Sequence, residues 1–329
     1  MARHLRSTAL GALLLVAACA GGQQGSDTSS PKATEPPPIT SLEDEDAVRI
    51  RVTGFVDWVV VAGGDAWVST DAPALRRIDG ETGDPVGSTR LPDVACTSMD
   101  VGFGSVWVGA CTSAVLVRID ERDGSVQARV KVGDEPLQSE GSVGAGEGGV
   151  WVLTVSPDPI LYKVDPRTNR VVGEFPVPEE SAAVRAGLGR VWITDPVNDE
   201  LVALDPRNGD VSGRVKVGPG ARFLAVGEGA VWVLNQSDGS VAQVDPESLS
   251  VVRKIDVSER PVGGGDIAVG GGFVWARISD ALVAQIDPAS GKVLARIGEP
   301  AGSGSVAADD DAVWITAHDV DAVWRIPLS

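Results

Sequence analysis

Residues 223–234 read Phe-Leu-Ala-Val-Gly-Glu-Gly-Ala-Val-Trp-Val-Leu, and this stretch decides the fold. Two short apolar runs flank the turn residues 227–229, a pattern typical of two β-strands joined by a tight turn. Two further apolar runs follow at 241–244 and 251–257, separated by a turn that begins Asp245-Pro246. The segment therefore predicts four consecutive antiparallel strands.

The same unit recurs along the chain, marked each time by a tryptophan between small apolar residues. The tryptophans stand about forty residues apart, at Trp67, Trp107, Trp151, Trp192, Trp232, Trp275 and Trp314. Four short strands fill that length, and a run of such units is typical of a β-propeller, in which each four-stranded sheet is one blade. We therefore predict an all-β fold, a seven-bladed β-propeller with four antiparallel strands per blade.

The two ends of the chain predict how the ring closes. The last unit reaches Ile326-Pro327 and the chain stops at Ser329, so this unit lacks its fourth strand. A counterpart lies at the other end, because residues 47–52 resemble the fourth strand at 211–217 and precede the first unit. We expect this N-terminal strand to complete the last blade, so that residues 47–329 form one domain without open sheet edges.

The repeated tryptophans allow two interpretations. They could form an aromatic binding ladder, or they could be wedges packed between neighbouring sheets. A residue required at the same place in every unit is explained more simply by packing. We therefore assign these tryptophans to the core.

The N-terminus has the pattern of a bacterial lipoprotein export signal. Arg3 and Arg6 precede an apolar run at 10–18, which is shorter than the ~20 residues that span a bilayer. Residues 16–19, Val-Ala-Ala-Cys, resemble the lipobox, in which the cysteine is acylated and becomes the new N-terminus; cleavage that leaves a free thiol is the alternative. We expect a signal peptide at 1–18, lipidation of Cys19, and a protein held by lipid on the extracytoplasmic side of the cell membrane.

Residues 19–46 are predicted to form a disordered tether. They are rich in Gly, Ser, Thr and Pro and end in the acidic run 43–46, with too few apolar side chains to offset the entropy of ordering. The whole chain is acidic, with a formal net charge of −18. This charge argues against nucleic acid as a partner, and it favours either cations and basic partners or simply a solvated surface.

Two rows of side chains on the predicted first strands indicate a site in the central channel. Counting seven residues back from each tryptophan gives mostly small residues, with Asp100 and Arg185 as exceptions. Counting nine back gives a second row on the same face of the strands, in which Trp58, Phe223 and Asp266 stand out. An acid and a base directed at one axis suit a zwitterionic or peptide ligand, with Trp58 and Phe223 as apolar walls. The alternative is that Asp100 and Arg185 neutralise each other and fill the channel.

Cys96 and Cys111 are predicted to form a disulfide. In a hairpin that pairs Val101 with Val106, the two cysteines face each other on adjacent strands. Export to an oxidising compartment favours the bond. A zinc site is the alternative, but two thiols without nearby histidines supply too few ligands.

The repeated phrases Val-Trp-Val, Ile-Asp-Pro and Val-Gly across residues 48–329 resemble the repeats of the YVTN and virginiamycin B lyase-like propeller superfamily, which is close to the NHL propellers. The resemblance implies a propeller fold but does not select one activity, because members of such superfolds include lyases, lactonases, sensors and scaffolds. The lyase members use a histidine together with a metal-binding carboxylate. After removal of the signal peptide this chain has one histidine, His318, so no histidine cluster can form.

These observations support three functional hypotheses. The one we favour is a membrane-anchored binding or sensory propeller that recognises a peptide, protein or envelope component at the channel mouth, through Trp58, Asp100, Arg185, Phe223 and Asp266. The second is a metal-dependent lyase or hydrolase with Asp100 or Asp266 as a metal ligand, and the third is a structural scaffold in a membrane-bound complex.

No catalytic residue is assigned, because the chain lacks the calcium-loop, G-x-S-x-G, H-E-x-x-H and Walker motifs. We expect a monomer without a resident cofactor. A bound divalent cation is the alternative, because the loops at the channel mouth carry acidic side chains that could coordinate it.

Overall fold

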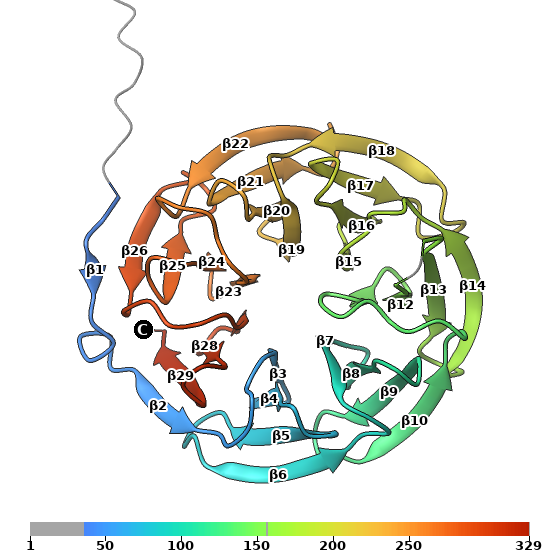
Figure 1. The fold of residues 1–329 in the computed structure, drawn as a ribbon, viewed down its shortest axis with the longest axis horizontal. Coiled ribbons are helices and arrows are strands. Elements are labelled where there is room, and N and C mark those ends of the chain that lie inside the picture. The colour runs from blue at the N-terminus through green and yellow to red at the C-terminus, as the bar shows by residue number, and fades with distance from the viewer. Residues whose placement is uncertain (1–35, 156, 329) are drawn as a thin grey trace, which may run out of the picture. The chain divides into compact units, whose positions relative to one another are not determined.

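The computed structural model of this protein describes residues 36–155 and 157–328, and its secondary structure consists of strands alone. Seven sheets are arranged around a central axis, and each sheet presents its first strand to that axis (Figure 1). This arrangement is a seven-bladed β-propeller, as predicted.

Each of the first six blades is built from consecutive strands, which follow one another in chain order from the axis outward. Blades 1 to 3 contain β3 (Val59–Ala62), β4 (Asp65–Ser69), β5 (Ala74–Asp79) and β6 (Pro85–Arg90); β7 (Ala95–Gly102), β8 (Ser105–Ala110), β9 (Val115–Asp120) and β10 (Val126–Lys131); β11 (Val143–Gly146), β12 (Gly149–Leu153), β13 (Ile160–Asp165) and β14 (Arg170–Pro176). Blades 4 to 6 contain β15 (Val184–Gly187), β16 (Arg190–Asp195), β17 (Glu200–Leu204) and β18 (Val211–Lys216); β19 (Ala221–Gly227), β20 (Ala230–Asn235), β21 (Ser240–Asp245) and β22 (Ser250–Asp256); β23 (Ile267–Gly270), β24 (Phe273–Arg277), β25 (Val283–Ile286) and β26 (Val293–Ile297).

Blade 7 joins the two ends of the domain. Its inner strands are β27 (Val306–Ala308), β28 (Ala312–Ala317) and β29 (Ala322–Pro327), and its outer strand is β2 (Val48–Arg51). β2 pairs antiparallel with β29, with Ile50 opposite Val323. The predicted closure is therefore confirmed, because β2 supplies the outer strand of blade 7.

The segment before β2 differs from the prediction of a disordered tether up to residue 46. β1 (Ile39–Thr40) pairs in parallel with β26 and adds a fifth strand to blade 6. The Thr40 carbonyl also accepts a hydrogen bond from the Gly298 amide at 2.9 Å. Backbone pairing with an open sheet edge thus orders a segment whose composition alone predicts disorder. The signal peptide, Cys19 and the tether up to residue 35 lie outside the described residues.

None of the described residues belongs to a helix long and apolar enough to cross a membrane.

The repeated tryptophans are core residues, as predicted. All seven are at most 1 % exposed. Each one packs among apolar side chains of the next blade: Trp107 contacts the cluster around Val143 and Val150, and Trp314 of the last blade packs with Val59 and Val68 of the first. The same tryptophan packing therefore also joins blade 7 to blade 1.

Each indole except that of Trp314 also satisfies its own N–H group. The Nε1 atom donates to the main-chain carbonyl five residues earlier, at 3.0–3.2 Å, in Trp67, Trp107, Trp151, Trp192, Trp232 and Trp275. A buried indole without such a partner would carry a desolvation cost.

A second contact links neighbouring blades, and sequence reasoning did not anticipate it. The third-strand residue opposite the tryptophan reaches a carbonyl in the turn after the third strand of the next blade. Lys163 Nζ donates to the Pro206 carbonyl at 2.7 Å, and Arg77 Nη2 donates to the Arg122 carbonyl at 2.6 Å. The Lys163 ammonium also lies 4.8 Å from the centre of the Trp151 ring, close enough for a cation–π interaction. The wedge and the turn of the next blade are thus held by the same side chain.

Cys96 and Cys111 form the predicted disulfide, with their Cα atoms 4.8 Å apart. The expected register is wrong at this point, because the pairing of β7 with β8 shifts between Ala95 and Met99. The Cys111 amide donates to the Val94 carbonyl at 3.3 Å, so Val94, and not Cys96, lies opposite Cys111. A bulge, with Thr97 at a φ of 43°, therefore places the two cysteines diagonally.

Ile50→Ala tests the closure of the ring. Ile50 is 9 % exposed and packs against Val323 and Ile78, whereas the neighbouring Arg51 is exposed. Because Ile50 is buried only if β2 completes blade 7, its truncation should lower the free energy of unfolding by about 2 kcal/mol or more. Arg51→Ala is the matched control on the same strand and should change it by less than about 0.5 kcal/mol. Equal urea midpoints for the two variants would contradict the closure.

Candidate functional site

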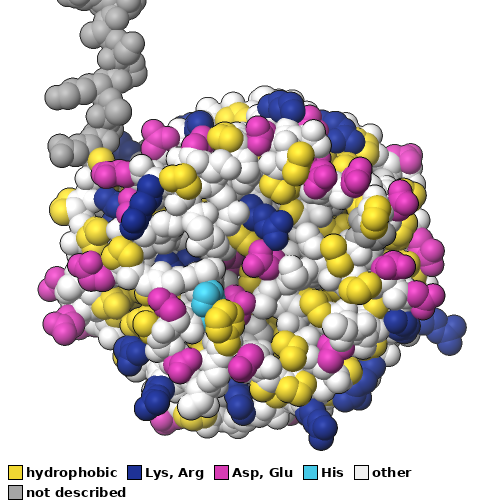
Figure 2. Space-filling model, in the orientation of Figure 1, with side chains coloured by type: hydrophobic (Ala, Val, Ile, Leu, Met, Phe, Trp, Pro, Cys, Tyr) yellow, Lys and Arg dark blue, Asp and Glu magenta, His cyan; other side chains and the backbone are white. Residues whose placement is uncertain are grey.

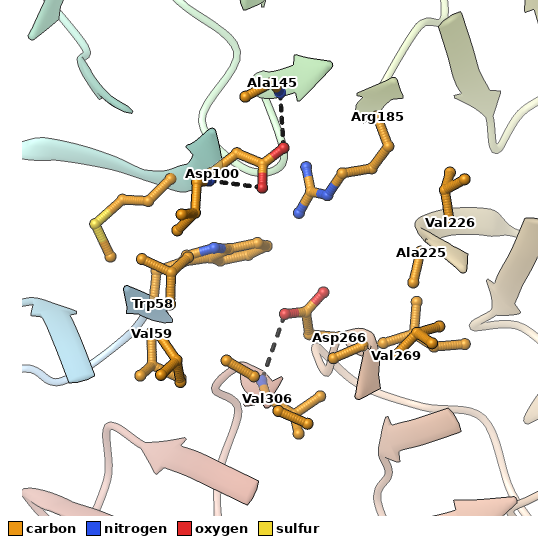
Figure 3. A pocket seen from close by; sticks show the side chains of 18 of the residues that line it. Trp58, Val59, Asp100, Ala145, Arg185, Ala225, Val226, Asp266, Val269 and Val306 are labelled. Atoms are coloured by element: carbon orange, nitrogen blue, oxygen red, sulfur yellow. Dashed lines mark hydrogen bonds between the residues drawn. The ribbon is translucent and has the colours of Figure 1, made fainter. Parts of the chain in front are cut away.

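A cavity of about 280 Å³ lies at the centre of the ring and is lined by the first strands of the blades. Four of the five predicted binding residues line it: Trp58, Asp100, Arg185 and Asp266. Asp100 comes from β7 and Arg185 from β15, each directly opposite the tryptophan of its blade, as the counted row predicts. Figure 3 shows the two carboxylates and the guanidinium pointing toward the middle of the cavity.

One end of this cavity is closed by the row nine residues before each tryptophan. Every member of this row is at most 3 % exposed: Trp58, Ser98, Ser142, Ala183, Phe223, Asp266 and Ser305. The rings of Trp58 and Phe223, from blades 1 and 5, meet with centroids 5.9 Å apart. These two side chains were expected to form the walls of an open mouth. They instead close that end, because small neighbours in the row leave room for the two rings to meet over the axis.

The other end of the cavity is the accessible one. The row six residues before each tryptophan is partly exposed in every blade and is apolar throughout: Val61, Val101, Ala145, Ala186, Val226, Val269 and Ala308. Exposure increases further toward the turns between first and second strands, where Phe103 and Leu188 are each 43 % exposed. Solvent therefore reaches Asp100 and Arg185 from the face that carries these turns, whereas Asp266 is buried.

Asp100 is fully hydrogen-bonded within the protein. One carboxylate oxygen accepts from the Val101 amide at 2.9 Å and the other from the Ala145 amide at 2.7 Å. Burial raises the pKa of Asp100, and the Arg185 guanidinium acts in the opposite direction. Each carboxylate oxygen of Asp100 thus already has a main-chain partner.

Arg185 forms no ion pair with any carboxylate among residues 36–155 and 157–328. Its Nη1 atom donates to the carbonyls of Val143 and Val184, at 2.9 and 2.8 Å. The approach of β11 to β15 depends on Gly144, since a Cβ atom there would lie 3.0 Å from the Arg185 Cα. The Nε and Nη2 atoms have no hydrogen-bond partner in the described chain, so direct pairing of Arg185 with Asp100 does not occur.

Asp266 is the least satisfied charged group in the cavity. The residue is 3 % exposed, and its Oδ2 atom accepts a long hydrogen bond from the Val306 amide at 3.4 Å. Its Oδ1 atom is buried without a partner. Burial raises the pKa of Asp266 to about 7, against a smaller opposing effect of Arg185. The Ile267 amide also stabilises the ionised carboxylate and so lowers its pKa. Native proteins rarely leave such an acceptor unpaired, so this atom calls for an explanation.

Beyond the closed end lies a group of charged residues that sequence reasoning missed. Arg222 lies over the Phe223 ring and pairs with Glu140 at 2.8 Å, which joins blade 5 to the loop before β11. Burial, reinforced by the Glu140 charge, raises the pKa of Asp57 to about 6. These residues lie one or two positions outside the counted rows, and nothing in the repeat pattern distinguishes them.

His318, the histidine that remains after the predicted removal of the signal peptide, stacks on Phe55 with ring centroids 4.0 Å apart. Burial lowers its pKa, so the neutral imidazole is favoured. His318 is absent from the residues that line the central cavity.

The acidic side chains are not gathered into one area on the face seen in Figure 2. Hydrophobic, acidic and basic side chains are intermixed there, with no broad region of a single charge. Across residues 36–155 and 157–328, no group of three or more His, Cys, Asp or Glu residues is arranged to hold a metal ion.

No protein-family model and no curated protein sequence matches this chain. Solved structures do match it. The structure of U3-55K is similar with a TM-score of 0.73 and 12 % identity, over 86 % of this chain and 98 % of that chain. A streptogramin B lyase structure is similar with a TM-score of 0.71 and 12 % identity, over 85 % and 96 %.

The β-propeller domain of Cps50 (Swd1) from Myceliophteria thermophila is similar with a TM-score of 0.69 and 14 % identity, over 86 % of this chain and 100 % of that domain. At these identities the likeness shows the propeller fold and nothing finer.

Asp266→Asn tests the environment of the buried carboxyl. The pKa of Asp266 is about 7 in the folded protein against an ordinary value of 3.8. The folded state therefore binds more protons than the unfolded chain between these values, and the wild-type protein loses stability as the pH rises through this range. The variant lacks this loss and should be more stable than wild type by roughly 4 kcal/mol at pH 8, but by little at pH 3.

Urea unfolding of both proteins across this pH range measures the difference. Asp205→Asn is a control with the opposite expected effect, because the Arg207 guanidinium lowers the pKa of the partly exposed Asp205 to about 2. That variant should be less stable than wild type at neutral pH. A difference between Asp266→Asn and wild type that does not change with pH would show that Asp266 does not titrate as described.

Proposed function

We propose that this protein is a lipid-anchored, extracytoplasmic binding propeller that recognises a peptide, protein or envelope component through the central cavity. The observation that carries the proposal is the pair of unsatisfied groups in one cavity: the buried Oδ1 atom of Asp266 and the free donors of Arg185. Unpaired buried polar groups are costly to a fold, and they mark binding sites because a ligand can satisfy them.

The choice of binding over catalysis rests on the composition of the cavity. Its lining contains two carboxylates and one guanidinium, but no histidine, cysteine or serine among the described residues. A serine, threonine or cysteine nucleophile with an adjacent histidine base is therefore missing from the lining. Apolar walls with a few convergent polar groups are typical of a ligand pocket.

A metal-dependent lyase or hydrolase is the second candidate. The likeness to a streptogramin B lyase structure and the raised pKa of Asp266, which suits proton transfer near neutral pH, favour it. A turnover assay with divalent cations added singly would separate the two candidates, since a binding propeller gives no cation-dependent product.

The proposed anchor rests on Cys19 in the lipobox-like sequence at 16–19 and on the short apolar run before it. Cys19→Ser should move the protein from the detergent phase to the aqueous phase in a Triton X-114 partition, because acylation needs the thiol. Cys111→Ser is the matched control and should stay in the detergent phase. Identical partition of Cys19→Ser and wild type would refute lipid anchoring through this residue.

Binding in the cavity is tested by Asp266→Asn. Peptide and small-molecule fractions released from the cell envelope should raise the melting temperature of the wild-type protein, and the variant should lose this response. Glu228→Gln changes the same charge at an exposed turn outside the cavity and should respond like wild type. If Asp266→Asn responds as strongly as wild type, the site lies elsewhere.

A further inference from the structure

The unsatisfied groups in the cavity are one acceptor and one set of donors. Asp100 has both oxygens engaged by main-chain amides, whereas Asp266 Oδ1 has no partner. Arg185 uses Nη1 for two carbonyls and leaves Nε and Nη2 without partners in the described chain. Figure 3 shows the Arg185 guanidinium and the Asp266 carboxylate directed toward the same space. A ligand that satisfies both must present a donor and an acceptor side by side.

The size of the cavity limits the ligand to one small molecule. Its volume is about 280 Å³, which lies just below the roughly 300–1,000 Å³ range of ordinary ligand pockets. A folded partner or a peptide of several residues does not fit into this space. The cavity is thus a subsite for a single group.

The walls of the cavity specify what the rest of that ligand must be. The row from Val61 to Ala308 that borders the accessible end contains only valine and alanine. The closed end is covered by the Trp58 ring. Such a surface favours a short aliphatic group and disfavours a second charge.

We propose that the cavity binds a free α-amino acid with a short aliphatic side chain. Its ammonium donates to Asp266 Oδ1, its carboxylate accepts from Arg185 Nε and Nη2, and its side chain lies against the ring of valines and alanines. The amino acid enters from the face of the turns between first and second strands. This proposal rests on the proposed binding function, but it replaces the peptide, protein or envelope component named there by a single free amino acid, because the cavity holds no more.

Isothermal titration of the full chain with three probes tests the ligand class. L-Valine carries both charges, L-valinamide lacks the carboxylate and N-acetyl-L-valine lacks the ammonium. L-Valine should bind about tenfold or more tightly than either analogue, because each analogue loses one charge-assisted hydrogen bond.

Two variants assign the charges to their residues. Asp266→Asn should weaken L-valine about tenfold or more and leave N-acetyl-L-valine unchanged, since that probe has no ammonium. Arg185→Lys, which keeps the charge but not the paired donors, should weaken L-valine and leave L-valinamide unchanged. Glu228→Gln is the control on the accessible face, and unfolding curves confirm that each variant is folded.

The outcomes separate this inference from the proposed function. Equal affinity of L-valine and L-valinamide would overturn a zwitterion site and leave an amine site. Failure of L-alanine, L-valine and L-leucine to bind would overturn the inference, while a response to envelope fractions that Asp266→Asn abolishes would preserve the binding function. Loss of that response as well would overturn both.

Discussion

A tryptophan wedged between neighbouring sheets is the contact on which the rest of this structure depends. It fills the gap where two twisted sheets diverge, and in every blade but the last its N–H group bonds to the first strand of its own blade. Because the wedge occupies the same place in each blade, it imposes one angle between neighbouring blades. That angle, repeated through Trp314 into the first blade, closes the ring.

Ring closure brings equivalent residues of the repeated blades together around one axis, where they form a site. The strands that face the axis bring one residue from each blade to the same depth, and where these residues are small the axis is a narrow channel. A few exceptions then determine the chemistry. Trp58 and Phe223 close one end, and Asp100, Arg185 and Asp266 place charges in the cavity that remains. Residues that break the repeat therefore carry more functional information than residues that obey it.

The solved structures similar to this one illustrate the same distinction between residues that build the fold and residues that determine the chemistry of the site. A streptogramin B lyase and the β-propeller domain of Cps50 (Swd1) share the ring at 12 % and 14 % identity. Such low identity is compatible with one fold because the repeat needs only short apolar strands, tight turns and a wedge between blades. The side chains around the axis are free to differ, and with them the ligand or reaction.

The sequence by itself determined the seven blades, the closure by β2, the buried tryptophans and the pairing of Cys96 with Cys111. The blades, the closure and the buried tryptophans follow from periodic patterns, which local strand geometry translates directly into structure. The cysteine pairing was predicted from a register that a bulge shifts, and the bond still forms because the bulge places the two cysteines diagonally. The sequence also named Asp100, Arg185 and Asp266, since counting from each tryptophan aligns the strands. Tertiary structure decided the rest. Which end of the channel is open depends on whether Trp58 and Phe223 reach each other across the axis, and that distance is set by the diameter of the ring. The bulge before Met99 and the pairing of β1 with blade 6 depend likewise on backbone contacts that no residue pattern encodes. Whether the Asp266 carboxylate has a hydrogen-bond partner depends on the positions of all seven first strands around the axis.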